Sequence, residues 1–89
     1  MSVHDFSNPE KVFKRAKVLG IDHIDISNRK DKKYKVYDGE KWIHFGQLGY
    51  EDYTKHKDKC RRDLFRTRNA RWADAPKMSP AWLSYYLLW

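Results

Sequence analysis

Residues 55–71 contain eight basic side chains, and this stretch is the part of the sequence best suited to binding chemistry. Only Asp58 and Asp63 oppose them, so the stretch carries +6 of the chain's formal net charge of +7. Guanidinium groups match phosphate and carboxylate geometry better than ammonium groups do. The arginines therefore predict an acidic partner, which could be nucleic acid, an anionic surface or an acidic protein, with a solvated helix face as the alternative. The cations are Lys55, Lys57, Lys59, Arg61, Arg62, Arg66, Arg68 and Arg71.

Lys35 and Trp42 form a second candidate binding group, on a predicted β-hairpin. Residues 33–37 and 40–45 flank Asp38-Gly39, the dipeptide that a two-residue type I′ turn prefers. That turn predicts the pairs Tyr37 with Glu40, Val36 with Lys41, Lys35 with Trp42, Tyr34 with Ile43, and Lys33 with His44. One face then holds Tyr34, Val36, Ile43 and Phe45, and the other holds Lys33, Lys35, Tyr37, Glu40, Trp42 and His44.

The second of these faces has two interpretations. Lys35 could lie over the Trp42 ring as a cation–π pair, while Tyr37 and Trp42 offer flat rings on which bases can stack. Together with the arginines, this face would supply the charge and stacking that a nucleic-acid surface needs. The alternative is that the first helix covers the same face, which would make Tyr37 and Trp42 core residues.

The C-terminal segment is the third unusual feature, because it has almost no polar face. A domain of this size can bury one side of such a helix but hardly all of it, and a large exposed apolar remainder marks a protein interface. We expect one face to close the core. The predicted interface residues are Trp82, Tyr85, Tyr86 and Trp89.

Catalysis and metal binding find little support. His56 and Cys60 are four residues apart, but two ligands do not make a zinc site. A surface or capping His beside a half-buried Cys is the simpler interpretation. His23 and His44, on neighbouring predicted strands, are likewise too few to make a metal site. No serine has a nucleophile-elbow context, and no acidic constellation favours a metal-dependent nuclease. We expect no enzyme activity, no metal and no cofactor.

The local signals predict an α+β fold, a three-stranded antiparallel meander with about three helices packed around it. Asn8 and Pro9 begin a helix over 9–19, and Gly20 ends it. The meander covers 21–45. Asp58 caps a second helix, about 59–69, within the basic segment 55–71; its apolar stripe would be Cys60, Leu64 and Phe65. Ser79-Pro80 begins the third helix, 79–89.

Length and composition limit the class of protein. The 89 residues form one predicted domain, 1–89, and their 14 aromatic side chains argue against disorder. No apolar run approaches the roughly 20 residues that span a bilayer, and no signal peptide is visible. We therefore expect a protein that neither spans a membrane nor is secreted. The single cysteine, Cys60, favours a reducing compartment.

An ordered set of short motifs over residues 33–89 resembles a family of small basic proteins encoded by large nucleocytoplasmic DNA viruses, especially viruses of algae. The motifs are Ile43–Gly46, Gly49–Thr54, His56–Asp58, Arg61-Arg62, Trp72, Trp82-Leu83 and Leu87–Trp89. Residues 1–32 match nothing in it. The resemblance implies a viral setting, in the virion and the host cytoplasm. We expect a non-enzymatic structural protein, a minor capsid or virion component that bridges larger proteins. The alternative is a basic nucleic-acid-binding module for DNA packaging or regulation.

Overall fold

The first helix forms as its N-terminal signal predicts. The structure is a computed structural model that describes residues 3–89, so the first two residues of the predicted domain lie outside the described residues. After a short 3₁₀ turn, η1 (Val3–Asp5), α1 spans Pro9–Val18. The Asn8 side chain accepts a hydrogen bond from the Lys11 backbone N–H at 3.4 Å, and Pro9 occupies the first turn. Gly20 follows the helix with a φ of +79°, a conformation that favours glycine.

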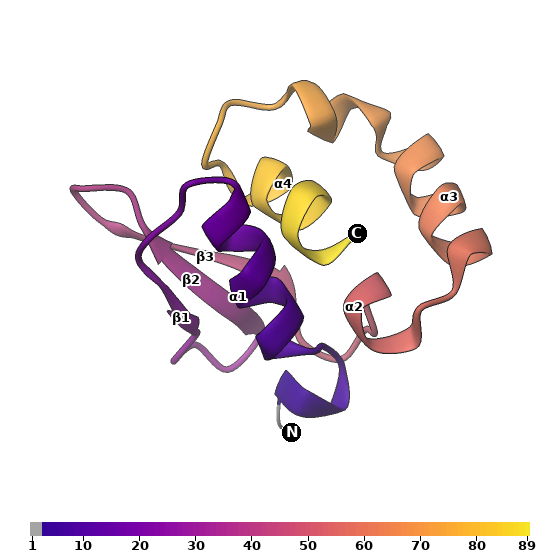
Figure 1. Cartoon of the computed structure of the whole chain (residues 1–89), viewed down its shortest axis with the longest axis horizontal. Coiled ribbons are helices and arrows are strands. Elements are labelled where there is room, and N and C mark those ends of the chain that lie inside the picture. Colours follow the sequence, from indigo (N-terminus) through magenta and orange to yellow (C-terminus); the bar gives the residue numbers. More distant parts are fainter. Residues whose placement is uncertain (1–2) are drawn as a thin grey trace.

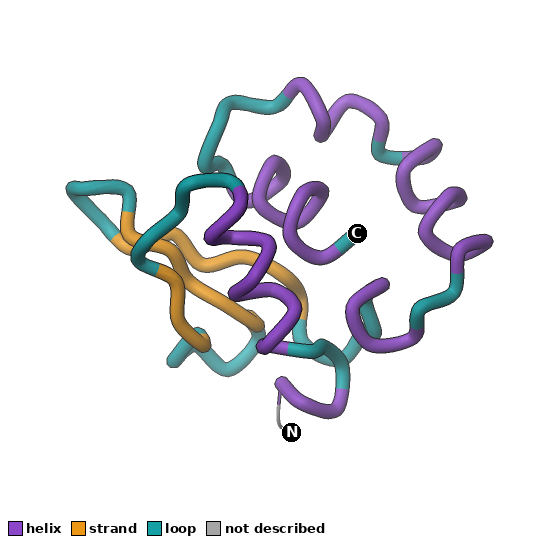
Figure 2. Tube along the Cα trace, viewed as in Figure 1, coloured by secondary structure: helices purple, strands orange, loops and turns teal. Residues whose placement is uncertain are grey.

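Three antiparallel strands form one sheet in the order β1-β2-β3, as the predicted meander requires. They are β1 (Ile24–Ile26), β2 (Lys32–Tyr37) and β3 (Trp42–Gln47). Five further helical segments follow the sheet. The fold is therefore α+β, with the strands on one side of the view and helices around them (Figure 2).

The register of the β2–β3 hairpin differs from the prediction. Tyr37 pairs with Trp42, where the predicted partner is Glu40. The two central turn residues are Gly39 and Glu40, because Asp38 accepts hydrogen bonds from the Glu40 and Lys41 backbone N–H groups at 2.8 and 2.9 Å. Gly39 has a φ of +104°, as the first central position of a type II′ turn requires.

The register shift preserves the predicted faces of the hairpin. Moving the turn centre by one residue moves every partner by two, and side chains alternate between faces with a period of two. Tyr34 now pairs with Phe45 and Val36 with Ile43, so the same four side chains still share the core face.

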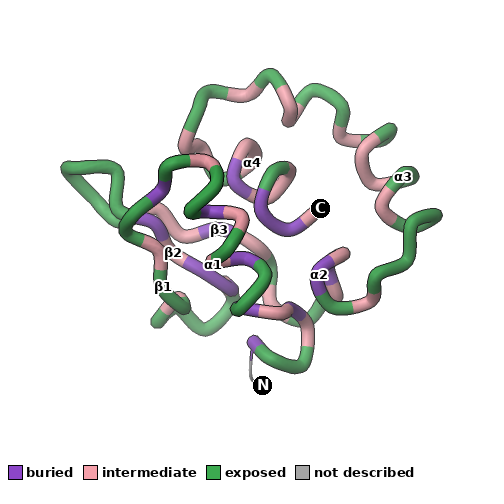
Figure 3. Tube along the Cα trace, viewed as in Figure 1, coloured by how far each residue is buried: buried purple, intermediate pink, exposed green. Residues whose placement is uncertain are grey.

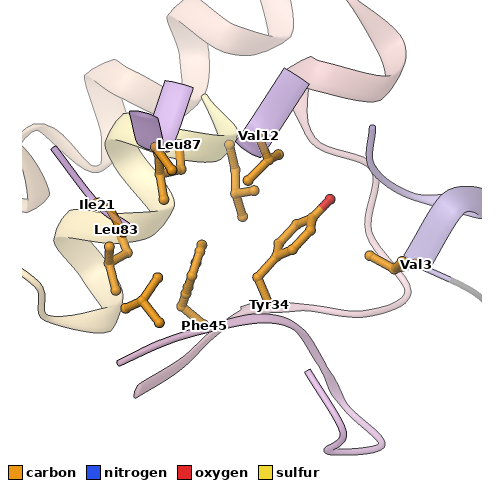
Figure 4. Close-up of a cluster of buried hydrophobic side chains, with 10 residues drawn as sticks. Val3, Val12, Ile21, Tyr34, Phe45, Leu83 and Leu87 are labelled. Atoms are coloured by element: carbon orange, nitrogen blue, oxygen red, sulfur yellow. The ribbon is translucent and has the colours of Figure 1, made fainter. Parts of the chain in front are cut away.

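The hydrophobic core lies between that sheet face and two helices (Figure 4). α1 contributes Val12 and Ala16, and the sheet contributes Tyr34, Val36 and Phe45. The C-terminal segment closes the core from α4 (Pro80–Leu83) and a π-helical turn that continues it, η3 (Ser84–Leu88). Its fully or almost fully buried side chains are Leu83, Leu87 and Leu88.

The basic segment lies outside this core. α2 (Tyr53–His56), α3 (Lys59–Arg68) and a 3₁₀ segment, η2 (Ala70–Asp74), follow one another around the molecule before the chain returns to α4 (Figure 1). α3 has no buried residue, as its exposed and half-buried colouring shows (Figure 3). The predicted apolar stripe of α3 is therefore wrong for Cys60 and Leu64, which are exposed, and only Phe65 is half-buried. The physical reason is that α3 packs against a few aromatic rings and does not lie on the sheet.

Candidate basic and aromatic surfaces

Asp58 fixes where the basic helix begins. Its carboxylate accepts hydrogen bonds from the backbone N–H groups of Cys60 and Arg61 at 3.0 and 3.2 Å, as predicted for an N-cap residue. The residues that follow are then set at 100° intervals around the helix. Arg61 and Arg68 are seven residues apart, so they share one face, and Arg62 and Arg66 lie on another.

Arg62 and Arg66 are turned toward the protein. The Arg62 guanidinium carbon lies 4.6 Å from the centre of the Tyr53 ring. Arg66 donates a hydrogen bond to the Trp89 backbone oxygen at 2.8 Å, and its guanidinium carbon lies 5.6 Å from the centre of the Tyr85 ring. Both arginines thus attach α3 to neighbouring segments, and only part of each side chain can meet a partner.

The remaining cations of the segment are exposed. Among residues 3–89, none of them forms an ion pair with a carboxylate within 4 Å. These exposed cations on and beside α3 are together called the α3 basic surface, and they are Lys55, Lys57, Lys59, Arg61, Arg68 and Arg71.

Lys11 of α1 extends this surface. Desolvation lowers the pKa of Lys11, and the nearby Lys57 lowers it further, so two like charges approach each other here. An anionic partner would relieve such repulsion.

The outer face of the sheet carries the second predicted group. The Lys35 ammonium lies 4.5 Å from the centre of the Trp42 ring, and the Trp42 and Tyr37 rings are 5.4 Å apart. Trp42 is 44% exposed and Tyr37 36% exposed, because α1 packs on the opposite face. The alternative in which α1 buries these rings is therefore wrong. At the edge of this patch His44 shares a 2.6 Å hydrogen bond with Ser27, and desolvation lowers the pKa of its imidazole.

The structure does not bring the two groups together. The β2–β3 turn and α3 lie at opposite ends of the long axis of the molecule (Figure 1). Lys35 and Trp42 therefore cannot share one small ligand with Arg61 and Arg68.

The C-terminal rings are mostly engaged within the protein. Trp89 stacks on Phe65, with centroids 4.2 Å apart and planes 8° from parallel, and both Trp82 and Trp89 pack against the core. The structure therefore contradicts the prediction that these two rings are left free for a partner, because Phe65 of α3 stacks on Trp89 and Trp82 packs against the core. Tyr85 is half-buried, and Tyr86 is 38% exposed.

Sequence reasoning missed a buried polar network. Lys33 donates to the Asp52 carboxylate at 3.0 Å, with the two side chains 3% and 1% exposed. Thr54 also donates to Asp52, and the Tyr34 hydroxyl donates to Ser7 at 2.7 Å. Burial lowers the pKa of Lys33, with Asp52 opposing the shift, and burial raises the pKa of Tyr34.

The network contradicts the prediction that Lys33 lies on an open sheet face. Gly46, opposite Lys33, has a φ of +77°, and the ladder skips this pair, so the strand is locally distorted. The segment after β3 then folds over Lys33 and brings Asp52 to it. No periodicity within residues 48–54 could have revealed this contact, although the Gly49–Thr54 motif contains Asp52 and Thr54.

Sequence reasoning also missed a cavity of about 570 Å³ between α3, η2, α4 and the end of β3. Its wall includes Arg61 of the α3 basic surface and several aromatic rings. The rings come from segments far apart in the sequence, so no local pattern predicts the cavity.

Neither a metal cluster nor a membrane-spanning helix is found in the part of the chain that the structure describes. No three His, Cys, Asp or Glu side chains of residues 3–89 lie close enough together to hold a metal ion. Cys60 is exposed on α3, whereas His56 lies against Trp89, with ring centroids 5.2 Å apart. No described helix combines the length and apolarity needed to cross a membrane.

A three-stranded antiparallel sheet, covered on one face by helices and joined to an exposed basic helix, defines a small α+β protein. The chain belongs to a family of unknown function (DUF5754), whose model matches residues 23–69. This segment contains the sheet, α2 and α3. No curated protein and no solved structure matches the chain.

The family match overlaps the predicted region of resemblance but has different limits. It starts at His23, ten residues before the predicted region of resemblance, so residues 23–32 do match a family model. It ends at Asn69, so the motifs at Trp72 and in the C-terminal segment lie outside the matched residues.

Proposed function

We propose that this protein is a non-enzymatic binding protein that contacts nucleic acid through the α3 basic surface. The observation that carries the proposal is the set of exposed cations on and beside α3, none of which has a carboxylate partner among residues 3–89. Phosphate groups attract such cations without reading sequence, and arginine binds them with two parallel hydrogen bonds. The Lys35–Trp42 patch is not part of this proposed surface, because it belongs to the β2–β3 hairpin, whose turn lies at the opposite end of the long axis from α3 (Figure 1).

The test is the salt dependence of binding to a short DNA, measured by fluorescence anisotropy. For a duplex, log K falls with log salt by about 0.9 per phosphate neutralised. Replacing Arg61, Arg68 and Arg71 together by Gln should weaken binding and flatten that slope by about 2.7 if each arginine meets one phosphate.

A matched control removes the same charge elsewhere. Lys17, Lys30 and Lys41 are exposed and lie outside the basic segment, so changing all three to Gln lowers the net charge by the same amount. The control variant should keep most of the slope of log K against log salt. Equal effects of the two triple variants would contradict a localised site, and no binding of the intact protein at physiological salt would refute the proposal.

A structural role in a virion is the second candidate. The Tyr86 ring is 38% exposed and lies 5.0 Å from Trp82 and 5.1 Å from Tyr85 by ring centroids, so a small aromatic patch remains for a protein partner. In this proposal the protein bridges capsid or virion proteins of a large DNA virus, and it resides in the virion and the host cytoplasm. Its α3 basic surface would then meet acidic protein surfaces.

The two candidates predict different variants to be damaging. Tyr86→Ser should reduce co-sedimentation with purified virions if the aromatic patch is the anchor, while the Arg61, Arg68 and Arg71 variant should reduce nuclease-sensitive association. Virion association that persists after nuclease treatment and depends on Tyr86 would favour the bridging role.

A further inference from the structure

The cavity beneath α3 has the size of a small-molecule site. Its volume of about 570 Å³ falls within the roughly 300–1,000 Å³ that such sites occupy. It lies between α3, η2, α4 and the end of β3. The lining residues that matter for recognition are Lys32, Tyr50, Arg61, Phe65, Trp72 and Trp89.

Aromatic rings form much of the cavity wall, and they hold one another in place. Phe65 stacks on Trp89 at 4.2 Å between centroids, and Trp72 meets the edge of Phe65 at 5.5 Å and 80°. Tyr50, which is 67% exposed, stands at the rim. Rings that are already fixed lose little conformational freedom when a ligand arrives, so the wall is preorganised for a flat ring.

The charges of the lining favour an anion. Lys33 is neutralised by Asp52 at 3.0 Å, which leaves Lys32 and Arg61 against a single acid, Glu51. A flat ring attached to an anionic group therefore suits this cavity better than a neutral or cationic molecule.

Arg61 connects the cavity to the α3 basic surface. It lines the cavity and also belongs to the exposed arginine face that it shares with Arg68. A strand whose phosphates follow that face would pass the mouth of the cavity. In a duplex the bases are stacked and paired, so only an unpaired or extruded base could enter.

We propose that the cavity receives one base of a single-stranded nucleic acid whose phosphate binds Arg61 and Lys32. This inference rests on the proposed function, and it specifies the ligand class as single strands. The rings of Trp72 and Tyr50 provide the stacking contact, and the α3 basic surface provides the phosphate contacts.

The experiment compares three DNA probes on the full chain by fluorescence anisotropy at one salt concentration. The probes are a 12-nucleotide oligo-dT strand, an abasic strand of the same length, and a 12-base-pair duplex. The abasic strand keeps the phosphates but has no base to stack. We expect oligo-dT to bind on the order of tenfold more tightly than the abasic strand, which is the loss expected for one stacked base.

Two variants and a matched control locate the effect. Trp72→Leu and Tyr50→Ala should each bring the affinity for oligo-dT toward that of the abasic strand. Val18→Ala shortens an exposed apolar side chain on α1 that does not line the cavity, and it should leave the affinity for oligo-dT unchanged. If Trp72→Leu fails to fold, the result for Tyr50→Ala tests the base-binding cavity, because Tyr50 is mostly exposed and its removal should not unfold the protein.

Each outcome separates this inference from the proposed function. Equal affinity for oligo-dT, abasic strand and duplex, all lost in the Arg61, Arg68 and Arg71 variant, would overturn the base-binding cavity and leave the phosphate surface intact. Binding of an acidic, tyrosine-containing peptide that depends on Trp72, without binding of any DNA, would overturn both in favour of a protein partner. No binding of DNA or peptide would also overturn both.

Discussion

Asp52→Asn should be one of the most damaging conservative substitutions in this protein. The substitution keeps the shape of the side chain but removes its charge. It leaves the Lys33 ammonium, now 3.0 Å from the carboxylate, in a site where its side chain is 3% exposed. The Thr54 hydroxyl, which also donates to Asp52, would lose a charged acceptor. An unpaired buried charge is costly because it has lost water without gaining a counter-charge.

The expected loss is large compared with the total stability. Removing one partner of a buried ion pair costs about 3–5 kcal/mol. A domain with 89 residues, at about 0.05–0.15 kcal/mol per residue, has a total free energy of unfolding of about 4–13 kcal/mol. Asp52→Asn should therefore remove a substantial fraction of the stability, or unfold the protein altogether.

The loss should depend on pH in a defined direction. Burial lowers the pKa of Lys33 in the folded state below its ordinary value of 10.5. The unfolded state therefore keeps this proton to a higher pH than the folded state does, and stability rises with pH wherever the unfolded state binds more protons. The damage caused by Asp52→Asn should shrink as pH rises toward 10.5, since a neutral Lys33 amine no longer needs a counter-charge.

Urea denaturation of four proteins tests the argument as a double-mutant cycle: the natural chain, Asp52→Asn, Lys33→Met and the double variant. The double variant should be less destabilised than the sum of the single variants, because it buries no charge. Glu10→Gln is the control; it breaks the exposed Lys14–Glu10 pair and should change stability by less than about 1 kcal/mol. A cost below about 1 kcal/mol for Asp52→Asn, or strict additivity, would refute the reasoning.

Three further predictions concern the turn, a buried hydroxyl and the C-terminal ring. Gly39→Val should reduce the free energy of unfolding by about 1–2 kcal/mol and lower the melting temperature, because Gly39 has a φ of +104°. An unchanged melting curve would contradict the assigned turn. Burial raises the pKa of the Tyr34 hydroxyl above its ordinary 10.0, so the unfolded state loses this proton at a lower pH than the folded state does. Ionisation of Tyr34 should therefore lower the free energy of unfolding by up to about 1.4 kcal/mol per pH unit above pH 10. Urea denaturation between pH 9 and 11 should show this loss of stability in the natural chain and not in Tyr34→Phe. Trp89→Ser should cost the monomer about 2 kcal/mol or more, since the ring stacks on Phe65, and a melting temperature equal to that of the natural chain would show that the ring is dispensable.

Helix starts could be predicted from the sequence because the contacts that define them are local. The Asn8, Asp58 and Ser79 side chains each accept a hydrogen bond from a backbone N–H two or three residues further on. Such contacts need no knowledge of the rest of the fold. The predicted and observed starts of all three helices therefore agree to within one residue.

The hairpin shows how a local prediction can fail and still assign the faces correctly. Asp38-Gly39 favours a type I′ turn by composition, but the Asp38 carboxylate accepts two backbone hydrogen bonds from within the turn. That places Asp38 before the central pair. The resulting shift of two residues keeps Tyr34 and Phe45 on the core face, since the strand period is also two.

Contacts between distant segments could not be predicted in this way. Lys33 and Asp52 are 19 residues apart, and Phe65 and Trp89 are 24 residues apart in the sequence. Lys33 is a charged residue at an outward position of the predicted strand, and Trp89 lies in a segment that is almost entirely apolar. Both are covered by segments whose path depends on the whole fold, so the strand alternation around Lys33 and the apolar composition around Trp89 assigned them to the surface.

The attachment of α3 links the fold to the proposed site. α3 buries no side chain fully, and it is held through Phe65 on Trp89, Arg62 on Tyr53 and Arg66 on the Trp89 backbone oxygen. An element with few buried apolar contacts belongs to the part of a protein that opens at the lowest free energy. Because Phe65 and Trp89 also line the cavity, a ligand seated there would add contacts between α3 and the core. Binding at the cavity should therefore stabilise the position of the helix that carries the phosphate-binding arginines, which makes the two parts of the proposed site mutually supportive.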